Sequence, residues 1–431
     1  MKTWIYNESL LIYIWQLQRF DTNELQTTEG QKIIIQNKGF RNNDAGPDFE
    51  NVRLIIDDTN WIGTIEIHWF SSDWYLHQHE DNPSFNNVIL HVVFEEDKII
   101  YNQNGNRIPC LELKNRIHTD ILNRTSNLNP NNWIPCEKLI SSVNDFTKTL
   151  WLERLVIERL ENKTKIIHAI LLENNWNWEE GFYILLCKYL GGPINSEPFE
   201  TLAKQTPFTI LLKNKDDQFI LESILFGQSG LLISDKNDEY MQKLTKEYQY
   251  QSNKYKLKPI QKHLWKFLRL RPANFPTLRI AELAALIRKN GTIFRKVIEC
   301  EDFKSLYQLF SITLSPYWDN HYVFGEYSKT IVKKLGKSEI NTLIINTIIP
   351  FLYFYAKQKN DDKLMTKAFE WLNQLPVEKN QIISKWNDLG FINKSASESQ
   401  ALIQLYKNYC MKQKCLECSI GHSIINPTIN Y

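Results

Sequence analysis

The first 115 residues alternate short apolar runs with polar turns, a pattern typical of a small sheet with few helices. Residues 8–20 (ESLLIYIWQLQRF) instead place apolar side chains at helical spacing, and Asn7 is a suitable N-cap. Residues 87–95 (NVILHVVFE) are dense in β-branched side chains, which predicts a strand buried on both faces. Further strands are expected at 33–35, 52–56, 62–69 and 108–113, the middle two joined by the polar turn 57–60.

From Thr149 onward the apolar positions follow a helical period, which begins with a long helix through Leu152 and Leu171. Residues 116–149 are rich in Asn and Ser and predict a connecting segment. More helices are expected at 280–289, 338–355, 361–372 and 397–411. The sequence therefore predicts an α+β protein with a mixed α/β domain over 1–115, a connecting segment over 116–149 and an α-helical region over 150–431.

Composition limits the class of protein and the way in which it could bind nucleic acid. Of the 431 residues 43% are hydrophobic and 23% charged, which excludes a wholly disordered chain. Lys and Arg number 51 against 49 Asp and Glu, so the net charge of +2 supplies no global attraction to a polyanion. A site for nucleic acid would therefore have to be a local patch.

The sequence shows neither a signal peptide nor a membrane span. The residues after Met1 lack a basic region followed by an apolar one, and the most apolar segment, Leu343–Tyr355, is shorter than the about 20 residues of a span. Seven cysteines, an odd number in a long chain, argue against a secreted disulfide framework. We expect a soluble, cytoplasmic protein with no membrane partner.

The predicted hairpin carries the most informative chemistry. Asp48 begins its first strand, and Glu66 and His68 lie two apart on the second, so both project from one face. The two carboxylates can then share a cation, and such oxygen ligands suit Mg²⁺ or Mn²⁺. The metal would lower the pKa of a bound water and neutralise charge on a phosphorus centre. The alternative is that Gly-Pro-Asp is simply a turn and Glu66 an exposed strand residue.

Pro47-Asp48, then a hairpin, then Glu66-x-His68 resemble the core of the P-D-(D/E)-x-K nuclease superfamily. The resemblance implies a nuclease-like phosphodiester hydrolase that acts on DNA or RNA. In that superfamily a helix, often with a glutamate, precedes the strands, and Glu8 occupies such a position here. The usual lysine is replaced by His68, whose charge depends on pH near neutrality.

A second group of potential ligands follows the hairpin. His77 and His79 come directly after its second strand, and His91 lies in the next one. Together with Asp73 and Asp81 they could ligate Zn²⁺ or Fe²⁺, which would indicate a histidine-centred metallohydrolase. The alternative is a polar loop with two solvated histidines and a His91 hydrogen-bonded inside the sheet.

Nearly the full length of the chain resembles a bacterial family of unknown function. That resemblance implies membership but no activity. It rests on GPDF at 46–49, residues 61–68, SDW at 72–74 with His77 and His79, VILHVV at 88–93, RPANFP at 271–276, SQAL at 399–402, and CLEC at 415–418 with Gly421.

Four potential soft ligands lie close together near the C-terminus: Cys410, Cys415, Cys418 and His422. Thiolates and an imidazole at such spacing suit tetrahedral zinc. The three cysteines with a distant one, such as Cys136, would also suit an iron–sulfur cluster, an arrangement that some P-D-(D/E)-x-K nucleases resemble. The alternative is a set of reduced thiols packed near a helix end.

Residues 246–271 carry eight Lys or Arg side chains and one acid, with aromatic residues between them. Such a stretch could neutralise phosphates while aromatics stack on bases, or it could be a helix with a solvated basic face. A non-catalytic nucleic-acid or protein-binding module on a degenerate nuclease fold therefore stays open as an alternative to the nuclease. The candidate phosphate contacts are Lys254, Lys256, Lys258, Lys262 and Arg269.

Overall fold

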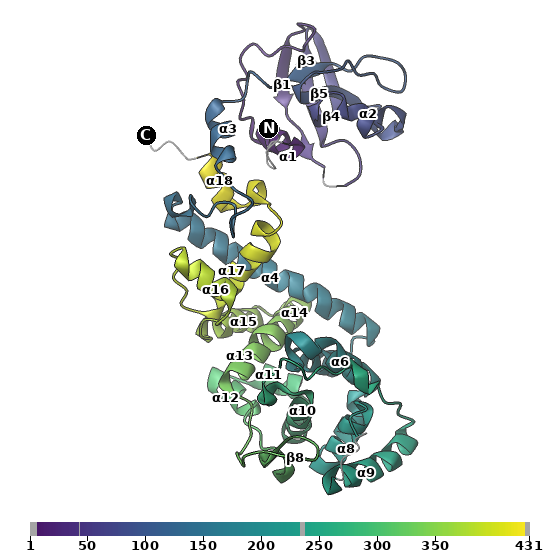
Figure 1. Cartoon of the computed structure of the whole chain (residues 1–431). Coiled ribbons are helices and arrows are strands. Elements are labelled where there is room, and N and C mark those ends of the chain that lie inside the picture. The colour runs from purple at the N-terminus through teal and green to yellow at the C-terminus, as the bar shows by residue number, and fades with distance from the viewer. Residues whose placement is uncertain (1–6, 43, 233–237, 427–431) are drawn as a thin grey trace. The chain divides into compact units, whose positions relative to one another are not determined.

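The structure is a computed structural model that describes residues 7–42, 44–232 and 238–426 (Figure 1). The chain forms two compact units. The first unit takes in the chain up to Glu153, together with Ser384–Phe391 and the segment from Leu402. The second unit comprises Arg154–Ile383 and Ile392–Ala401. The C-terminal segment therefore folds with the N-terminal part of the chain.

The first unit contains a mixed six-stranded sheet. Its strand order is β1-β3-β4-β5-β6, and β2 pairs with β3. Neighbours β1, β3 and β4 are antiparallel, whereas β5 is parallel to β4 and β6 is parallel to β5. The strands are β1 (Ile33–Asn37), β2 (Phe40–Arg41), β3 (Phe49–Ile56), β4 (Thr59–Phe70), β5 (Val88–Glu95) and β6 (Cys110–Glu112).

Helix α1 (Glu8–Leu17) packs against β4 through a continuous run of buried residues from Leu10 to Trp15. The parallel pairing of β4 and β5 requires a crossover, because parallel strands cannot be joined by a tight turn. Helix α2 (Asp73–Leu76), η1 (His79–Asp81) and η2 (Pro83–Phe85) form this crossover. Trp74 anchors it in a small core with Phe85, Val88, Ile100 and Ile108.

Other short helices complete the first unit: α3 (Thr119–Ser126), η3 (Ile140–Ser142), the π-helical turn η8 (Tyr406–Cys410), η9 (Cys415–Glu417) and α18 (Ser419–Ile425). Helix α4 (Asp145–Glu173) begins in the first unit and continues in the second.

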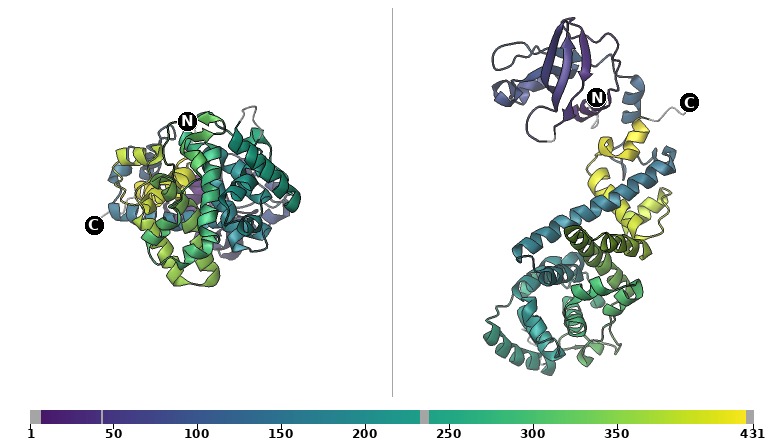
Figure 2. Two further views of the ribbon diagram at one scale, coloured as in Figure 1. Left: turned by 90° about the horizontal axis from the view of Figure 1, so that it is seen from below. Right: turned by 180° about the vertical axis from the view of Figure 1, so that it is seen from behind.

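The second unit is almost entirely helical, as both views of Figure 2 show. None of the helices in the described part of the chain is long and apolar enough to cross a membrane. The helices include α5 (Trp178–Leu190), α6 (Gly192–Gln205), α8 (Gln218–Gln228), α9 (Glu239–Tyr255), α10 (Pro276–Asn290), α13 (Lys337–Leu343), α14 (Ile349–Lys359) and α15 (Asp362–Gln374).

The predicted α+β class is confirmed, and most expected elements are present within a few residues of their predicted bounds. The hairpin turn is tighter than predicted: Thr59 and Asn60 pair with β3, which leaves Asp57 and Asp58 as a two-residue turn. Asp57 takes a left-handed φ of 51°, as such turns require.

The helix expected at 338–355 is present, but it is not α-helical throughout. A π-helical turn, η7 (Ile344–Ile348), separates α13 from α14. Pro350 lies in the first turn of α14 and has no N–H to donate to the preceding turn. The wider turn before it accommodates the proline within a continuous helical run.

Candidate metal centre

The candidate centre lies on β4, whose residues Glu66 and His68 project from the same face. The antiparallel neighbour β3 and the parallel neighbour β5 both contribute to it. Phe49 pairs with Ile65, so Asp48, just before β3, lies beside Glu66. On β5, His91 pairs with Glu66 in the register. The strand order thus gathers residues that are up to 43 positions apart in the sequence.

The carboxylates of Asp48 and Glu66 meet at this end of the hairpin. The backbone N–H of Asp48 donates to Oε2 of Glu66 at 3.1 Å. In return the N–H of Ile67 donates to Oδ2 of Asp48 at 3.0 Å. Each carboxylate is thereby held by a backbone N–H of the other strand, and the two are near enough for their charges to interact, as two ligands of one cation would be.

Burial raises the pKa of both carboxyls. The pKa of Asp48 rises to about 7, through burial first and then repulsion from Glu66, while Arg41 acts in the opposite direction. The pKa of Glu66 rises to about 8, through burial and, to a smaller degree, the charge of Glu8. Burial and the neighbouring Asp48 also raise the pKa of Glu8, which places this residue of α1 at the same centre.

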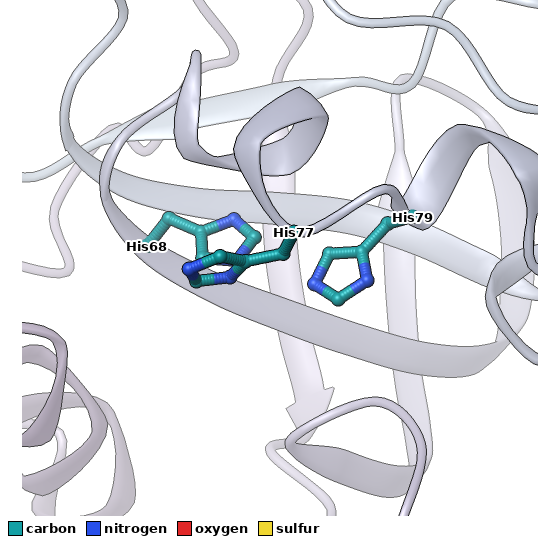
Figure 3. Close-up of side chains that lie close together, drawn as sticks. All are labelled: His68, His77 and His79. Atoms are coloured by element: carbon teal, nitrogen blue, oxygen red, sulfur yellow. The ribbon is translucent and has the colours of Figure 1, made fainter.

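Three histidines complete the group (Figure 3). Nε2 of His79 lies 3.2 Å from Oε1 of Glu66, and Nε2 of His68 lies 3.5 Å from the same oxygen. Nε2 of His68 is also 3.1 Å from Nδ1 of His77. Each of the three rings offers one nitrogen, and these nitrogens all lie within 4.8 Å of one another. Three imidazoles at this spacing can ligate one metal ion.

The fold of the crossover sets the positions of the two loop histidines, His77 and His79. Trp74 is fully buried, and its ring packs against those of His79 and His91 at 5.3 and 5.6 Å. Gln78, between the two histidines, has a left-handed φ of 59° that reverses the chain direction. His79 then stacks on Phe85 at 3.9 Å, which holds its ring toward Glu66.

His91 contacts His68 from β5 and is not one of the three grouped histidines. Its side chain is fully buried, and its Nε2 lies 2.8 Å from Nδ1 of His68. Burial lowers the pKa of His91 to about 3 and that of His68 to about 2, so both rings are neutral at physiological pH. A partner on the second nitrogen fixes the orientation of a ligating imidazole, which makes His91 a positioning residue for His68.

Without metal, the raised carboxyl pKa values and the lowered histidine pKa values leave the centre close to neutral. A divalent cation would convert both carboxyls to carboxylates and would supply the positive charge that offsets them. The donor set therefore fits a metal ion.

Two other sequence candidates take different positions. Asp81 is exposed at the end of η1, and Asp73 accepts a hydrogen bond from the N–H of Phe70 at 3.1 Å. Asp73 still contributes to the electrostatics at Glu8. Arg41, which lowers the pKa of Asp48, was not predicted, because no spacing rule relates a two-residue edge strand to the hairpin.

The proposed basic contacts lie in the second unit. Lys254 lies in the last turn of α9 and is near the rings of Tyr250 and Tyr255. Tyr250 is 62% exposed, whereas Trp265 is buried and donates its indole N–H to the carbonyl of Ser229 at 2.7 Å. Not every aromatic residue of the stretch can therefore stack on a base. The side chains of Lys254, Lys256, Lys258, Lys262 and Arg269 are all exposed.

The sequence profile of a family described as "Protein of unknown function (DUF2851)" matches residues 8–381. The chain belongs to this family. The DUF2851 match covers every residue of the candidate metal centre, so the centre lies in the part of the chain that defines membership. The expected resemblance to a family of unknown function is thereby confirmed. No curated protein and no solved structure gives a significant match to the chain.

Proposed function

We propose that the chain is a divalent-metal-dependent phosphodiester hydrolase that acts on nucleic acid. The observation that carries the proposal is the pair of hydrogen bonds that joins Asp48 to Glu66 and Ile67 at one end of an antiparallel hairpin, with Glu8 of the preceding helix near enough to interact electrostatically with Asp48. This is the arrangement expected of a P-D-(D/E)-x-K-like core. A metal held there would activate a water and offset the charge that develops on the phosphorus.

His68 cannot take the role of the usual lysine as a cation, because its ring stays neutral. A neutral imidazole serves instead as a metal ligand or a hydrogen-bond acceptor. His77 is exposed and hydrogen-bonded to His68, and it would hold the metal together with His68 and His79.

The histidines also change which metal fits. Carboxylates suit Mg²⁺ or Mn²⁺, whereas imidazoles suit Fe²⁺ or Zn²⁺, so a site that combines both kinds of ligand fits Mn²⁺ or Fe²⁺. With three imidazoles within 4.8 Å, we propose Mn²⁺ or Fe²⁺ ahead of Mg²⁺. The nucleic-acid substrate is supported separately by the exposed lysines that follow α9, whose charge can neutralise phosphates.

Calorimetric titration of the purified chain with Mn²⁺ and Mg²⁺ tests the metal site. Wild-type protein should bind Mn²⁺ more tightly than Mg²⁺, and Asp48→Asn and Glu66→Gln should abolish binding. Glu50→Gln, an exposed carboxylate on β3, is the matched control and should bind as wild type does. Cleavage of single- and double-stranded DNA and RNA should be faster with Mn²⁺ than with Mg²⁺, should be lost in Asp48→Asn and Glu66→Gln, and should be kept in Glu50→Gln. Unchanged metal binding in both variants would overturn the proposal.

The histidine group favours a second candidate, a metallohydrolase with tightly held Zn²⁺ or Fe²⁺. Elemental analysis of the protein as purified separates the two. Stoichiometric zinc that is lost in His77→Ala and His79→Ala but kept in Asp48→Asn would favour this candidate over a carboxylate-centred nuclease.

A further inference from the structure

Four of the seven cysteines gather in the first unit, although they come from two distant parts of the chain. All seven lie in the described part of the chain and are free thiols. Cys110, Cys187 and Cys300 lie on other elements, in β6, in α5 and after Glu299. The four-cysteine cluster consists of Cys136, between α3 and η3, Cys410 at the end of η8, Cys415 at the start of η9, and Cys418 just before α18.

The thiols of the cluster interact electrostatically with one another. The pKa of Cys410 is raised by burial and then by Cys136, Cys418 and Cys415, and that of Cys415 by burial and then by Cys136 and Cys418. Cys136, Cys415 and Cys418 are each 7% exposed. As neutral thiols these side chains can be buried at little cost, whereas as thiolates they would need a thiophilic metal to offset their charge.

Cys418 has hydrogen-bond donors near its sulfur. Burial raises the pKa of the Cys418 thiol, while the backbone N–H groups of Gly421 and Ile420 and the side chain of Trp151 act in the opposite direction. N–H donors to sulfur are a recurring feature of metal–thiolate sites and tune the bound group.

Gly421 explains how α18 approaches the cluster. A Cβ at this position would overlap the carbonyl oxygen of Cys415, so the backbones of η9 and α18 can be this close only with glycine here. The close approach brings α18, which Cys418 precedes, against η9, which begins with Cys415.

The spacing of the sulfurs distinguishes between metals. Among the described residues, the three histidines form the group of potential ligands whose donor atoms all lie within 4.8 Å, so no three cluster sulfurs come that close. One tetrahedral zinc, with Zn–S of about 2.3 Å, would bring its sulfurs to about 3.8 Å from one another. An iron–sulfur cluster places its cysteines on separate irons and therefore accepts a wider spacing.

We propose that an iron–sulfur cluster binds here, ligated by the thiolates of Cys136, Cys410, Cys415 and Cys418. Its role is structural: it joins the segment before α4 to the C-terminal segment of the same unit. We leave His422 out of the ligand set, because the electrostatic partners of Cys410 and Cys415 are the other cysteines, and the ring of His422 packs edge-on against Tyr13 of α1 at 5.9 Å. Since α1 also contacts η9, the cluster would stabilise the helix that carries Glu8.

The test is anaerobic purification of the full chain, followed by measurement of iron, acid-labile sulfide and zinc per chain. We expect sulfide with an equal amount of iron, in addition to any iron held by the histidine group, and a broad visible absorption that bleaches on reduction. Iron held instead by the histidine group would carry no sulfide. Zinc without iron, or no metal after reconstitution with iron and sulfide, would overturn the proposal.

Variants then test the ligand set. Cys136→Ser and Cys415→Ser should each lower iron and sulfide to background, whereas the control Cys300→Ser should retain both. Full iron and sulfide in Cys136→Ser would overturn the assignment of the fourth ligand. The wild-type spectrum remains a test even if a serine variant fails to fold.

Discussion

Replacing Glu66 with glutamine tests whether its carboxyl is held protonated in the metal-free protein. Glutamine keeps the shape and the oxygen that accepts from Asp48 but cannot ionise. In wild type, burial raises the pKa of Glu66 from 4.5 to about 8, so the folded state keeps a proton that the unfolded chain releases. Metal-free wild-type protein should therefore lose stability as pH rises from about 4.5 to about 8.

The magnitude follows from the same pKa change. At about 1.4 kcal/mol per pKa unit, a rise from 4.5 to about 8 corresponds to roughly 5 kcal/mol of unfolding free energy. The Glu66 side chain is 7% exposed, so solvent screens the charge of its carboxylate only slightly. For a unit of this size the melting temperature should differ by roughly 10 °C or more at high pH. Asp48, with a pKa of about 7, leaves the variant a smaller pH dependence of the same sign.

Thermal unfolding followed by circular dichroism, in EDTA between pH 5 and 9, measures the difference. Plots of melting temperature against pH for wild type and Glu66→Gln should converge at low pH and separate as pH rises, with the variant more stable. Glu50→Gln, exposed on β3, should follow wild type throughout. Parallel curves for wild type and Glu66→Gln would refute the reasoning, because the carboxyl would then ionise alike in the folded and unfolded states.

Three further predictions concern single positions. His91→Leu removes the nitrogen bonded to His68 and should weaken metal binding about 10- to 100-fold in calorimetry, whereas equal affinity would exclude a positioning role. Gly227→Ala places a methyl group against the ring of Tyr248 and should lower the unfolding free energy by about 1–3 kcal/mol in urea titration; an unchanged midpoint would contradict that contact. Lys258→Ala should weaken nucleic-acid binding regardless of sequence and reduce the salt slope by about 0.9, as measured by fluorescence anisotropy, while an unchanged slope would remove this lysine from the interface.

The local sequence pattern was sufficient to predict every strand of the sheet except the two-residue β2. The β-branched run at 87–95 predicted β5 as a strand buried on both faces, and the burial of β5 agrees. The hairpin was found as well, but its turn was placed two residues too wide, because polar residues such as Thr59 and Asn60 can extend a strand into solvent. The break at η7 depends on how Pro350 fits a helix that continues past it, which hydrophobic spacing does not show.

The candidate site was less predictable than the fold. The spacing placed Glu66 and His68 on one face of a strand, and the structure brings Asp48 to the same point. Sequence reasoning separated the carboxylates and the loop histidines into two competing sites, whereas they form a single group. The crossover between β4 and β5 unites them, and its path depends on the burial of Trp74 and the left-handed turn at Gln78.

The sequence by itself determined the α+β class, the strands, the long helices and the residue types that can bind metal, because each depends on neighbours a few positions away. Tertiary structure alone decided that the histidines join the carboxylates, that His91 supports His68, and that Cys136 lies with cysteines at the other end of the chain. Those contacts depend on which strands pair and which segments pack together. Burial then sets the pKa values, and it is a property of the folded surroundings rather than of the sequence spacing.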